Sequence, residues 1–371
     1  MQPGDHLVDN HGQKTPYRVQ DLVAAGEHYQ IARARDEEHQ RDVALRAIVY
    51  GDEASGDAGV ASRREGLRRQ WALLDDLSEL ALLPEPVEWL EVGASPIDAP
   101  PEPLLVCEYI EGTELYDWVA EEYPEGLDPR RALELVGDLA ALCSACHEHG
   151  WLWRDFDPTR FIIDADKQLR AVSTGHVVPA EGDETPPAPS PNANYTAPQL
   201  RENVRQSHKQ PAADLYGVGA LASFLLTGQE PRHRVESPLS YTAHQRLREL
   251  ELPGVELLIA RLLQPMADKR LDSADELRTF CSVDALPSTE DEGFADCSLP
   301  APWEGLDIDN PEQNRGLQSQ LSSGPLVSMK SENNNDDNDA AGDQSEIDWT
   351  MIIWVLMVAA VAALLALLVA L

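Results

Sequence analysis

Positive charge is scarce in this chain, and lysine supplies little of it. The 371 residues include 65 Asp and Glu against 29 Lys and Arg, which gives a net charge of −36. Nucleic-acid binding needs clustered Lys and Arg to neutralise phosphates, so a surface this acidic repels DNA and RNA. We therefore expect no nucleic-acid partner.

Cysteine is also rare. The five cysteines are an odd number, and the chain is long enough to form a core without disulfides. Cys143, Cys146 and His147 have the spacing of a c-type haem attachment motif, and with His149 they form an alternative zinc set. Cysteines three residues apart on an amphipathic helix read more naturally as core residues. We therefore predict no metal site.

Charge is absent from one long stretch, Trp349–Leu371, which consists mostly of Ala, Leu, Val, Ile and Met. As a helix it would span roughly 34 Å, which matches a bilayer core of about 30 Å. The first 17 residues have no apolar run, so no signal peptide is predicted. We therefore expect a single-pass tail anchor in the cell membrane through residues 349–371, with the rest of the chain in the cytoplasm.

The composition changes along the chain indicate four parts. Residues 283–346 are rich in Asp, Glu, Asn, Ser and Pro and have little apolar periodicity, which is typical of a disordered acidic linker. The predicted organisation is an N-terminal segment (1–15), a folded domain (16–282), this linker (283–346) and the transmembrane anchor (347–371). Ala359 and Ala363 have the small-residue spacing that lets two such helices form a homodimer, although alanine is also simply a good helix former.

The folded domain is predicted to begin with strands and to continue with helices. Its strand-like runs are Val43–Tyr50, Val87–Val92 and Leu104–Tyr109, with a helical stretch, Ser62–Leu77, after the first. The later helical stretches are Arg130–His147, Leu215–Leu226 and Val255–Leu263. A β-rich part followed by a helical part is an α+β arrangement.

A series of short motifs follows a fixed order through this domain. They are Leu22–Ile31 with Gly26, Val43–Arg46, Glu65, Leu105–Gly112, Trp153–Phe161, Ser173–Gly175, Tyr195–Gln199, Asp214–Gly219 and Arg270. No motif is specific alone, but their order and spacing resemble those of bacterial serine/threonine (Hanks-type) protein kinases over roughly residues 16–282. The resemblance implies a bilobal protein-kinase-like fold, with a small β-rich lobe and a larger helical lobe.

The resemblance also implies nucleotide-binding positions. These are Gly26, Ala44, Arg46, Glu65, Glu108 and Ile110. Arg46 stands where the family has its phosphate-holding lysine, and Glu65 would pair with it; the alternative is two unrelated charges. Tyr29 stands at a glycine position and would direct its ring to where phosphate lies. Backbone groups of Glu108 and Ile110 would contact an adenine.

The catalytic positions depart from the family pattern. Asp155 matches the base that accepts the substrate proton, with a structural role in the loop as the alternative. Trp153 replaces the family's histidine and Asp157 its lysine, while Arg160 and Ser173 replace two metal-binding residues. A guanidinium has no lone pair for Mg²⁺, and a hydroxyl is a poorer ligand than a carboxylate.

The helical-lobe positions follow the family pattern more closely. Asp214 matches the residue that braces the catalytic-loop backbone. Arg270 matches an arginine that pairs with a glutamate in the family, so it would here hydrogen-bond to Gln199.

The structural motifs of the family are kept, whereas its catalytic and metal-binding residues are changed. Together with the predicted anchor, this pattern predicts a membrane-anchored pseudokinase. It would act as a signalling scaffold or regulatory binding module for a protein partner, either a kinase or a kinase substrate. The expected cofactor is none, or ATP bound weakly or without Mg²⁺. The alternative is a divergent but active serine/threonine kinase that phosphorylates proteins with ATP and uses Asp155 and Asp157 in unconventional metal ligation.

Overall fold

The computed structural model describes residues 1–25, 29–49, 57–93, 101–181, 192–201, 210–232 and 238–299. The chain divides into two units, Met1–Gly305 and Leu306–Leu371, and every described residue lies in the first. No helix among the described residues is long and apolar enough to cross a membrane. The predicted anchor at 347–371 and most of the predicted linker lie outside them.

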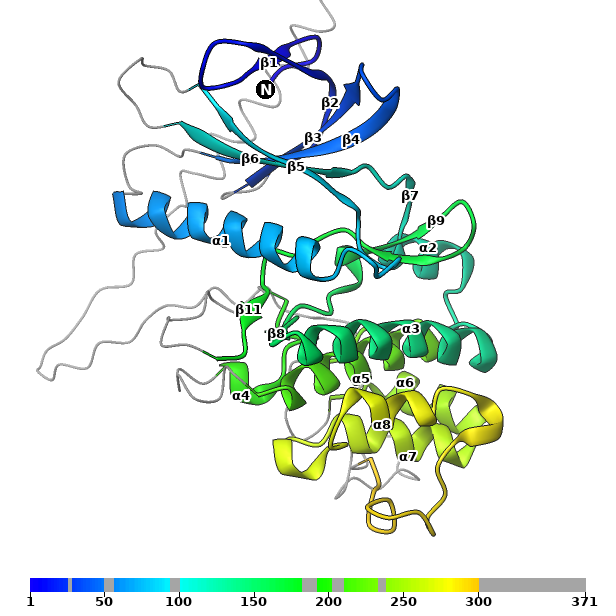
Figure 1. Cartoon of the computed structure of the whole chain (residues 1–371). Helices are drawn as coiled ribbons and strands as arrows, with labels where there is room; N and C mark the ends of the chain where they lie inside the picture. The colour runs from blue at the N-terminus through cyan, green and yellow to red at the C-terminus, as the bar shows by residue number, and fades with distance from the viewer. Residues whose placement is uncertain are drawn as a thin grey trace, which may run out of the picture. The chain divides into compact units, whose positions relative to one another are not determined.

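A six-stranded antiparallel sheet forms the first lobe, in the order β1-β2-β3-β4-β6-β5 (Figure 1). The strands are β1 His6–Val8, β2 Lys14–Ala25, β3 Tyr29–Asp36, β4 Arg41–Ile48, β5 Pro86–Val92 and β6 Glu102–Glu108. Val43 and Leu45 of β4 are fully buried in a core on one face of this sheet. Because successive side chains of a strand point to opposite faces, Ala44 and Arg46 lie on the other face.

Helix α1 (Asp57–Asp76) packs on that other face, against β4, β5 and β6. Its apolar side chains Leu67, Leu73 and Leu74 are buried, which confirms the helix predicted from Ser62. The face that carries Arg46 is therefore covered by α1 rather than by solvent.

The N-terminal segment is part of this lobe. Strand β1 pairs with β2, and Asp9 forms a bridge to Val92 of β5. Met1 and Leu7 pack against the core of the sheet. Residues before the predicted domain start at residue 16 therefore pack on the sheet of this lobe.

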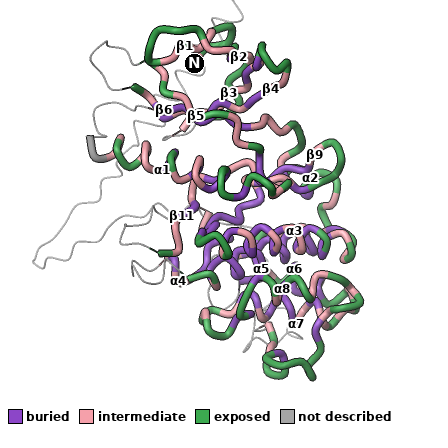
Figure 2. Tube along the Cα trace, viewed as in Figure 1, coloured by how far each residue is buried: buried purple, intermediate pink, exposed green. Residues whose placement is uncertain are grey.

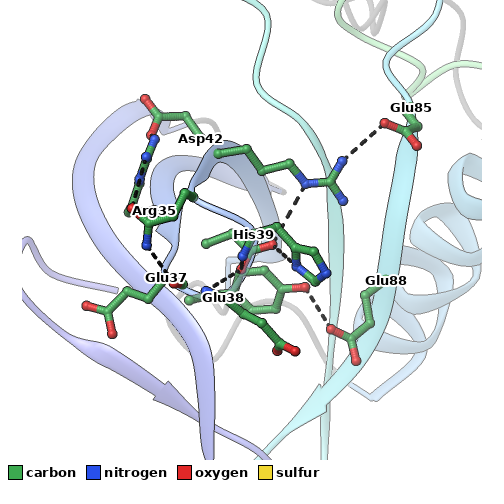
Figure 3. A network of polar contacts seen from close by, with 11 residues as sticks. Arg35, Glu37, Glu38, His39, Asp42, Glu85 and Glu88 are labelled. Carbon is green, nitrogen blue, oxygen red and sulfur yellow. Dashed lines mark hydrogen bonds and ion pairs between the residues drawn. The ribbon is translucent and has the colours of Figure 1, made fainter.

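A network of carboxylates holds the turn between β3 and β4 (Figure 3). Asp36 is fully buried and accepts hydrogen bonds from the backbone N–H groups of Glu38 and His39, at 3.0 and 3.1 Å. Burial would raise the pKa of Asp36, but these hydrogen bonds outweigh it and hold the pKa below its ordinary value. On the neighbouring strand Asp42 accepts from Arg35 (3.0 Å) and Arg33 (2.8 Å).

The second lobe is mostly helical and follows the hinge after β6. Its elements are β7 Gly112–Glu114, α2 Leu115–Glu122, α3 Pro129–Glu148, β8 Trp151–Leu152, η1 Pro158–Arg160, β9 Phe161–Asp164, β10 Leu169–Ala171, β11 Val178–Pro179, α4 Pro198–Arg201, α5 Ala212–Thr227, α6 Tyr241–Glu249, α7 Pro253–Leu262, η3 Ala267–Lys269, α8 Ala274–Thr279 and η4 Val283–Ala285. The predicted helical stretches correspond to α3, α5 and α7.

Helix α5 is the centre of this lobe, and nearly all of it is buried (Figure 2). Gly217 on α5 faces the catalytic loop at close range. A Cβ atom at this position would lie 2.4 Å from Cδ2 of Phe156, so only glycine lets that ring approach the helix. The loop between β8 and β9 is thereby packed directly on α5.

The folded domain continues beyond its predicted end at residue 282. Residues 283–299 are described, and Phe294 among them is only 1% exposed. Its ring packs edge-on against Phe280 at 5.3 Å and lies under the guanidinium of Arg261 at 6.0 Å. Phe294 thus packs residues that follow the predicted domain end onto the helical lobe.

Candidate functional site

Asp214 on α5 holds the catalytic loop, as predicted. Its carboxylate is 1% exposed and accepts from the backbone N–H groups of Trp153 (2.9 Å) and Arg154 (2.7 Å). Nε2 of His147 lies 2.9 Å from the same carboxylate. Arg154 has a positive φ of 65°, a left-handed conformation that non-glycine residues adopt only when the surroundings impose it. These contacts hold the backbone of the catalytic loop at Trp153 and Arg154 against α5.

The residue at the catalytic-base position is held by a cation. Asp155 is 2% exposed, and its Oδ2 accepts a hydrogen bond from Nε of Arg160 at 2.9 Å. Nε2 of His176 lies 3.5 Å from the same oxygen. Trp153 is buried, and its indole N–H donates to the backbone carbonyl of Asp155 at 2.7 Å. Trp153 and Arg160, which depart from the family pattern, therefore hold Asp155 in place. Trp153 bonds to its backbone carbonyl and Arg160 to its carboxylate.

The residues at the metal positions do not suit Mg²⁺. Arg160 directs a guanidinium, which has no lone pair to donate, at the nearest carboxylate. Ser173 is half-buried and carries only a hydroxyl. Among the described residues no group of three or more His, Cys, Asp or Glu is arranged to hold a metal ion. We derive no chemical step through a metal at this site.

Arg46 joins three elements through neutral oxygens. It donates to Oε1 of Gln70 on α1, to Oγ1 of Thr174 at 3.0 Å and to the carbonyl of Val172 at 2.7 Å. Arg46 is 6% exposed, and burial lowers the pKa of its guanidinium. The side chain that should reach toward phosphate is instead used to connect β4, α1 and the segment after β10.

The partner predicted for Arg46 was wrong. The Glu65 side chain is about half exposed and lies 3.7 Å from Arg68 of the same helix. Gln70, five residues later, is 1% exposed and takes the place facing Arg46. Motif spacing along the chain missed this residue; the buried face of α1 was the signal that could have found it.

The expected position of Tyr29 was also wrong. Its hydroxyl donates to the carbonyl of Arg63 on α1 at 3.0 Å, and its ring passes over Gly66. The side chain therefore points to α1 and fastens it to β3. Gly26, the remaining glycine of the predicted phosphate loop, lies outside the described residues.

The predicted adenine-binding positions lie where β4 meets the hinge. Ala44 is half-buried opposite Cys107, and burial raises the pKa of the Cys107 thiol to about 11. The backbone N–H of Glu108 donates to the carbonyl of Glu85 at 2.8 Å. Ile110 follows in the hinge and is half-buried.

Asp157 occupies the family's lysine position and begins η1. It is 5% exposed and accepts from both the backbone N–H (2.9 Å) and the hydroxyl (2.8 Å) of Thr159. The loop therefore contains two buried carboxylates, Asp155 and Asp157, and among the described residues only Asp155 has a basic partner.

The buried glutamine–arginine contact predicted in the helical lobe is present. Nη2 of Arg270 donates to Oε1 of Gln199 at 2.9 Å. The guanidinium also donates to the carbonyls of Gln264, Pro265 and Ala212 and lies over the ring of Tyr216.

The two cysteines of the haem-like motif lie in the core. Cys143 and Cys146 are fully buried on α3, and burial raises the pKa of each thiol well above its ordinary value. His147 contacts Asp214, as described above. Core packing accounts for the two cysteines, and the contact with Asp214 accounts for His147.

Comparison with known proteins agrees with this geometry. The protein kinase domain family matches residues 19–277. The chain is 26% identical to the serine/threonine-protein kinase PknB of Mycobacterium leprae over 284 residues, 74% of this chain and 42% of PknB. It is 28% identical to PknL of Mycobacterium tuberculosis over 245 residues, 66% of this chain and 56% of PknL.

The fold has a counterpart among solved structures. The kinase domain of Mycobacterium tuberculosis PknI superposes with a TM-score of 0.51 at 18% identity, covering 75% of this chain and 96% of that domain. The chain spans only about half the length of the curated relatives it matches. The family match covers most of this chain, and its relatives are bacterial serine/threonine kinases; the chain belongs to the protein kinase family.

Proposed function

We propose that this protein is a membrane-anchored pseudokinase, a signalling scaffold or regulatory binding module whose Mg²⁺–ATP phosphotransfer is impaired or absent. The ion pair between Arg160 and Asp155 carries the proposal. Phosphoryl transfer depends mostly on positioning and on neutralisation of charge by metal. Here the Arg160 guanidinium stands at a metal-ligand position of the family and is hydrogen-bonded to the carboxylate of Asp155. This carboxylate is the group that would accept the proton of the substrate hydroxyl.

The contacts of Arg46 support the same proposal. A lysine ammonium at this position would be a compact donor for phosphate, whereas the planar guanidinium bonds to oxygens of α1 and of the segment after β10. These contacts hold α1 against the sheet through oxygens of the protein itself.

The membrane anchor is a further part of the proposal, and it rests on the uncharged run Trp349–Leu371. The anchor would keep the kinase-like domain at the cytoplasmic face of the cell membrane, where it would bind a kinase or a kinase substrate. Carbonate extraction of membranes from cells that express the full chain tests it. We expect the chain to stay in the pellet, and release into the supernatant would contradict the anchor.

Thermal unfolding of the full chain with ATP tests the loss of catalysis, because a ligand that binds only the native state raises the melting temperature. We expect no Mg²⁺-dependent shift, and at most a small metal-independent shift from an adenine held at the hinge. A clear Mg²⁺-dependent shift, followed by phosphate transfer that Asp155→Asn abolishes, would contradict the pseudokinase proposal.

The alternative is a divergent but active serine/threonine kinase. The observation that favours it is the name of the relatives, which are serine/threonine-protein kinases, together with Asp155 at the base position. Asp155→Asn separates the two proposals. If the chain is a pseudokinase, binding of its protein partner should survive this substitution; if it is an active kinase, the variant should lose phosphate transfer.

A further inference from the structure

Arg46 is a buried cation without a counter-charge. Its side chain is only 6% exposed, and it donates to side-chain oxygens of Gln70 and Thr174. A third hydrogen bond goes to the carbonyl of Val172, so every acceptor is a neutral group. Across the part of the chain that the structure describes, no carboxylate forms an ion pair with this guanidinium. Buried charges are normally paired, because an unpaired ion is costly to remove from water. One positive charge therefore stays uncompensated between β4 and α1.

The same pair of side chains presents hydrogen-bond donors that have no acceptor. Nε of Arg46 and Nε2 of Gln70 are buried and bond to no described residue. Oε1 of Gln70 accepts from Arg46 and from the hydroxyl of Thr174 at 3.4 Å, and a reversed amide would instead point its N–H groups at the guanidinium. A water molecule would accept from these donors, but it would bring two O–H donors of its own. The unmatched groups therefore call for an acceptor that donates nothing.

The nearby groups that could become anionic are neutral. Cys107 and Tyr29 are the two titratable side chains whose anionic forms would act on Arg46. Burial raises the pKa of the Cys107 thiol to about 11 and holds the pKa of the Tyr29 hydroxyl above its ordinary value. The Tyr29 hydroxyl is also engaged, since it donates to the carbonyl of Arg63 at 3.0 Å. Neither side chain supplies a negative charge at neutral pH.

We propose that a halide ion, chloride under ordinary conditions, binds between Arg46 and Gln70 and supplies this charge. A halide accepts hydrogen bonds and donates none, so it suits a place where only N–H donors are left over. The ion would bridge β4 and α1, the elements that carry the two side chains. The packing of α1 on the sheet then depends on the halide concentration. The inference does not rest on the loss of phosphotransfer.

The occupant is a single atom rather than a phosphate group. Gln70 and Thr174 are each 1% exposed, and together with Arg46 they are enclosed beneath α1. A nucleotide phosphate is attached to a sugar and a base, so it needs an open path to the guanidinium. A monatomic ion needs no such path, because it can be enclosed as α1 packs on the sheet during folding. The site thus differs from the phosphate site implied by the family resemblance in its ligand and in its access from solvent.

Thermal unfolding of the full chain measures this binding, because unfolding releases the ion and a ligand of the native state raises the melting temperature. Sodium chloride replaces sodium gluconate at a constant ionic strength of about 0.5 M, so that general screening of the net charge of −36 stays the same. We expect chloride to raise the melting temperature by about 2–4 °C, and bromide to act alike. Acetate, a monovalent anion of several atoms, should give no rise.

Gln70→Glu is the variant that ties the chloride effect to this site. Its carboxylate would keep the contact with Arg46 and supply the counter-charge from within the chain, so the variant should stay folded and lose the chloride-dependent rise. Arg46→Met should lose the rise as well, because it removes the cation. Glu65→Gln changes a charge at a half-exposed position of the same helix and is the matched control, which should keep the rise.

Three results would overturn the inference. They are equal melting temperatures of the unsubstituted chain in chloride and gluconate; a chloride-dependent rise in Gln70→Glu as large as that of the unsubstituted chain; and an equal rise with acetate. The ATP titration is a separate measurement with a different ligand, so the two proposals can fail separately.

Discussion

Two buried arginines, one in each lobe, make the same contact with different consequences. Arg46 in the β-rich lobe bonds to the amide oxygen of Gln70, and Arg270 in the helical lobe bonds to that of Gln199. Arg270 donates its other hydrogen bonds to carbonyls of its own lobe, whereas Arg46 reaches from β4 to Thr174 in the other lobe. Arg270 therefore stabilises the helical lobe. Arg46, at the position where the family holds phosphate, instead connects β4 to α1 and to the segment after β10.

Replacement of Arg270 should have the largest effect. Arg270→Met would leave three buried carbonyls and the Gln199 side chain without their donor, and we expect a loss of about 3–5 kcal/mol in the free energy of unfolding. Denaturant unfolding measures it. Arg248→Met, at an exposed position on α6, is the control and should change stability by less than about 0.5 kcal/mol. Equal losses would show that the contacts of Arg270 do not matter.

Replacement of Arg46 should have a smaller effect. Arg46→Met removes three hydrogen bonds, but it also removes a buried charge, and Thr174 can still bond to Gln70 at 3.4 Å. We expect a loss of about 1–3 kcal/mol. Arg18→Met, at an exposed position on β2, is the matched control. A loss as large as that of Arg270→Met would erase the distinction between the two arginines.

A carboxylate introduced beside Arg46 should stabilise the fold. Gln70→Glu converts a neutral acceptor into a charged one, and a charge-assisted bond is roughly twice as strong, so we expect a gain of about 1 kcal/mol. The gain should be present at neutral pH and vanish as the new carboxyl is protonated in acid. Glu65→Gln, at the position first expected to face Arg46, should change stability little. A larger effect at Glu65 would contradict the assigned partner.

The smallest effect on the free energy of unfolding is expected at Asp42, a carboxylate that pairs with two arginines. Asp42 pairs with Arg33 and Arg35 near the surface, and although burial opposes it, these bonds hold the pKa of Asp42 below its ordinary value of 3.8. Its contribution is therefore present above pH 3.8 and is lost as the pH falls through the lowered pKa. Asp42→Asn should cost about 0.2–1 kcal/mol at pH 7 and less at pH 3. A constant difference across this range would contradict the ion-pair origin.

Motif order predicted the helical lobe better than the nucleotide cleft. The contacts of Asp214 and Arg270 followed from their places in the series, because α5 and the segments around it have the spacing of the family. The partner of Arg46 did not follow, because only a view of which α1 face is buried distinguishes Gln70 from Glu65.

The segment that follows α8 determines where a truncated fragment of this protein can end. A fragment cut at residue 282 would remove Phe294, uncover the ring of Phe280 and leave Gly254 without the chain at Leu286 and Pro287 that packs against it. Such a fragment would expose apolar side chains and would self-associate through them. The association seen in a dimerisation assay would then be an artefact of the truncation. A cut placed after residue 299 keeps the last folded turn and avoids that artefact.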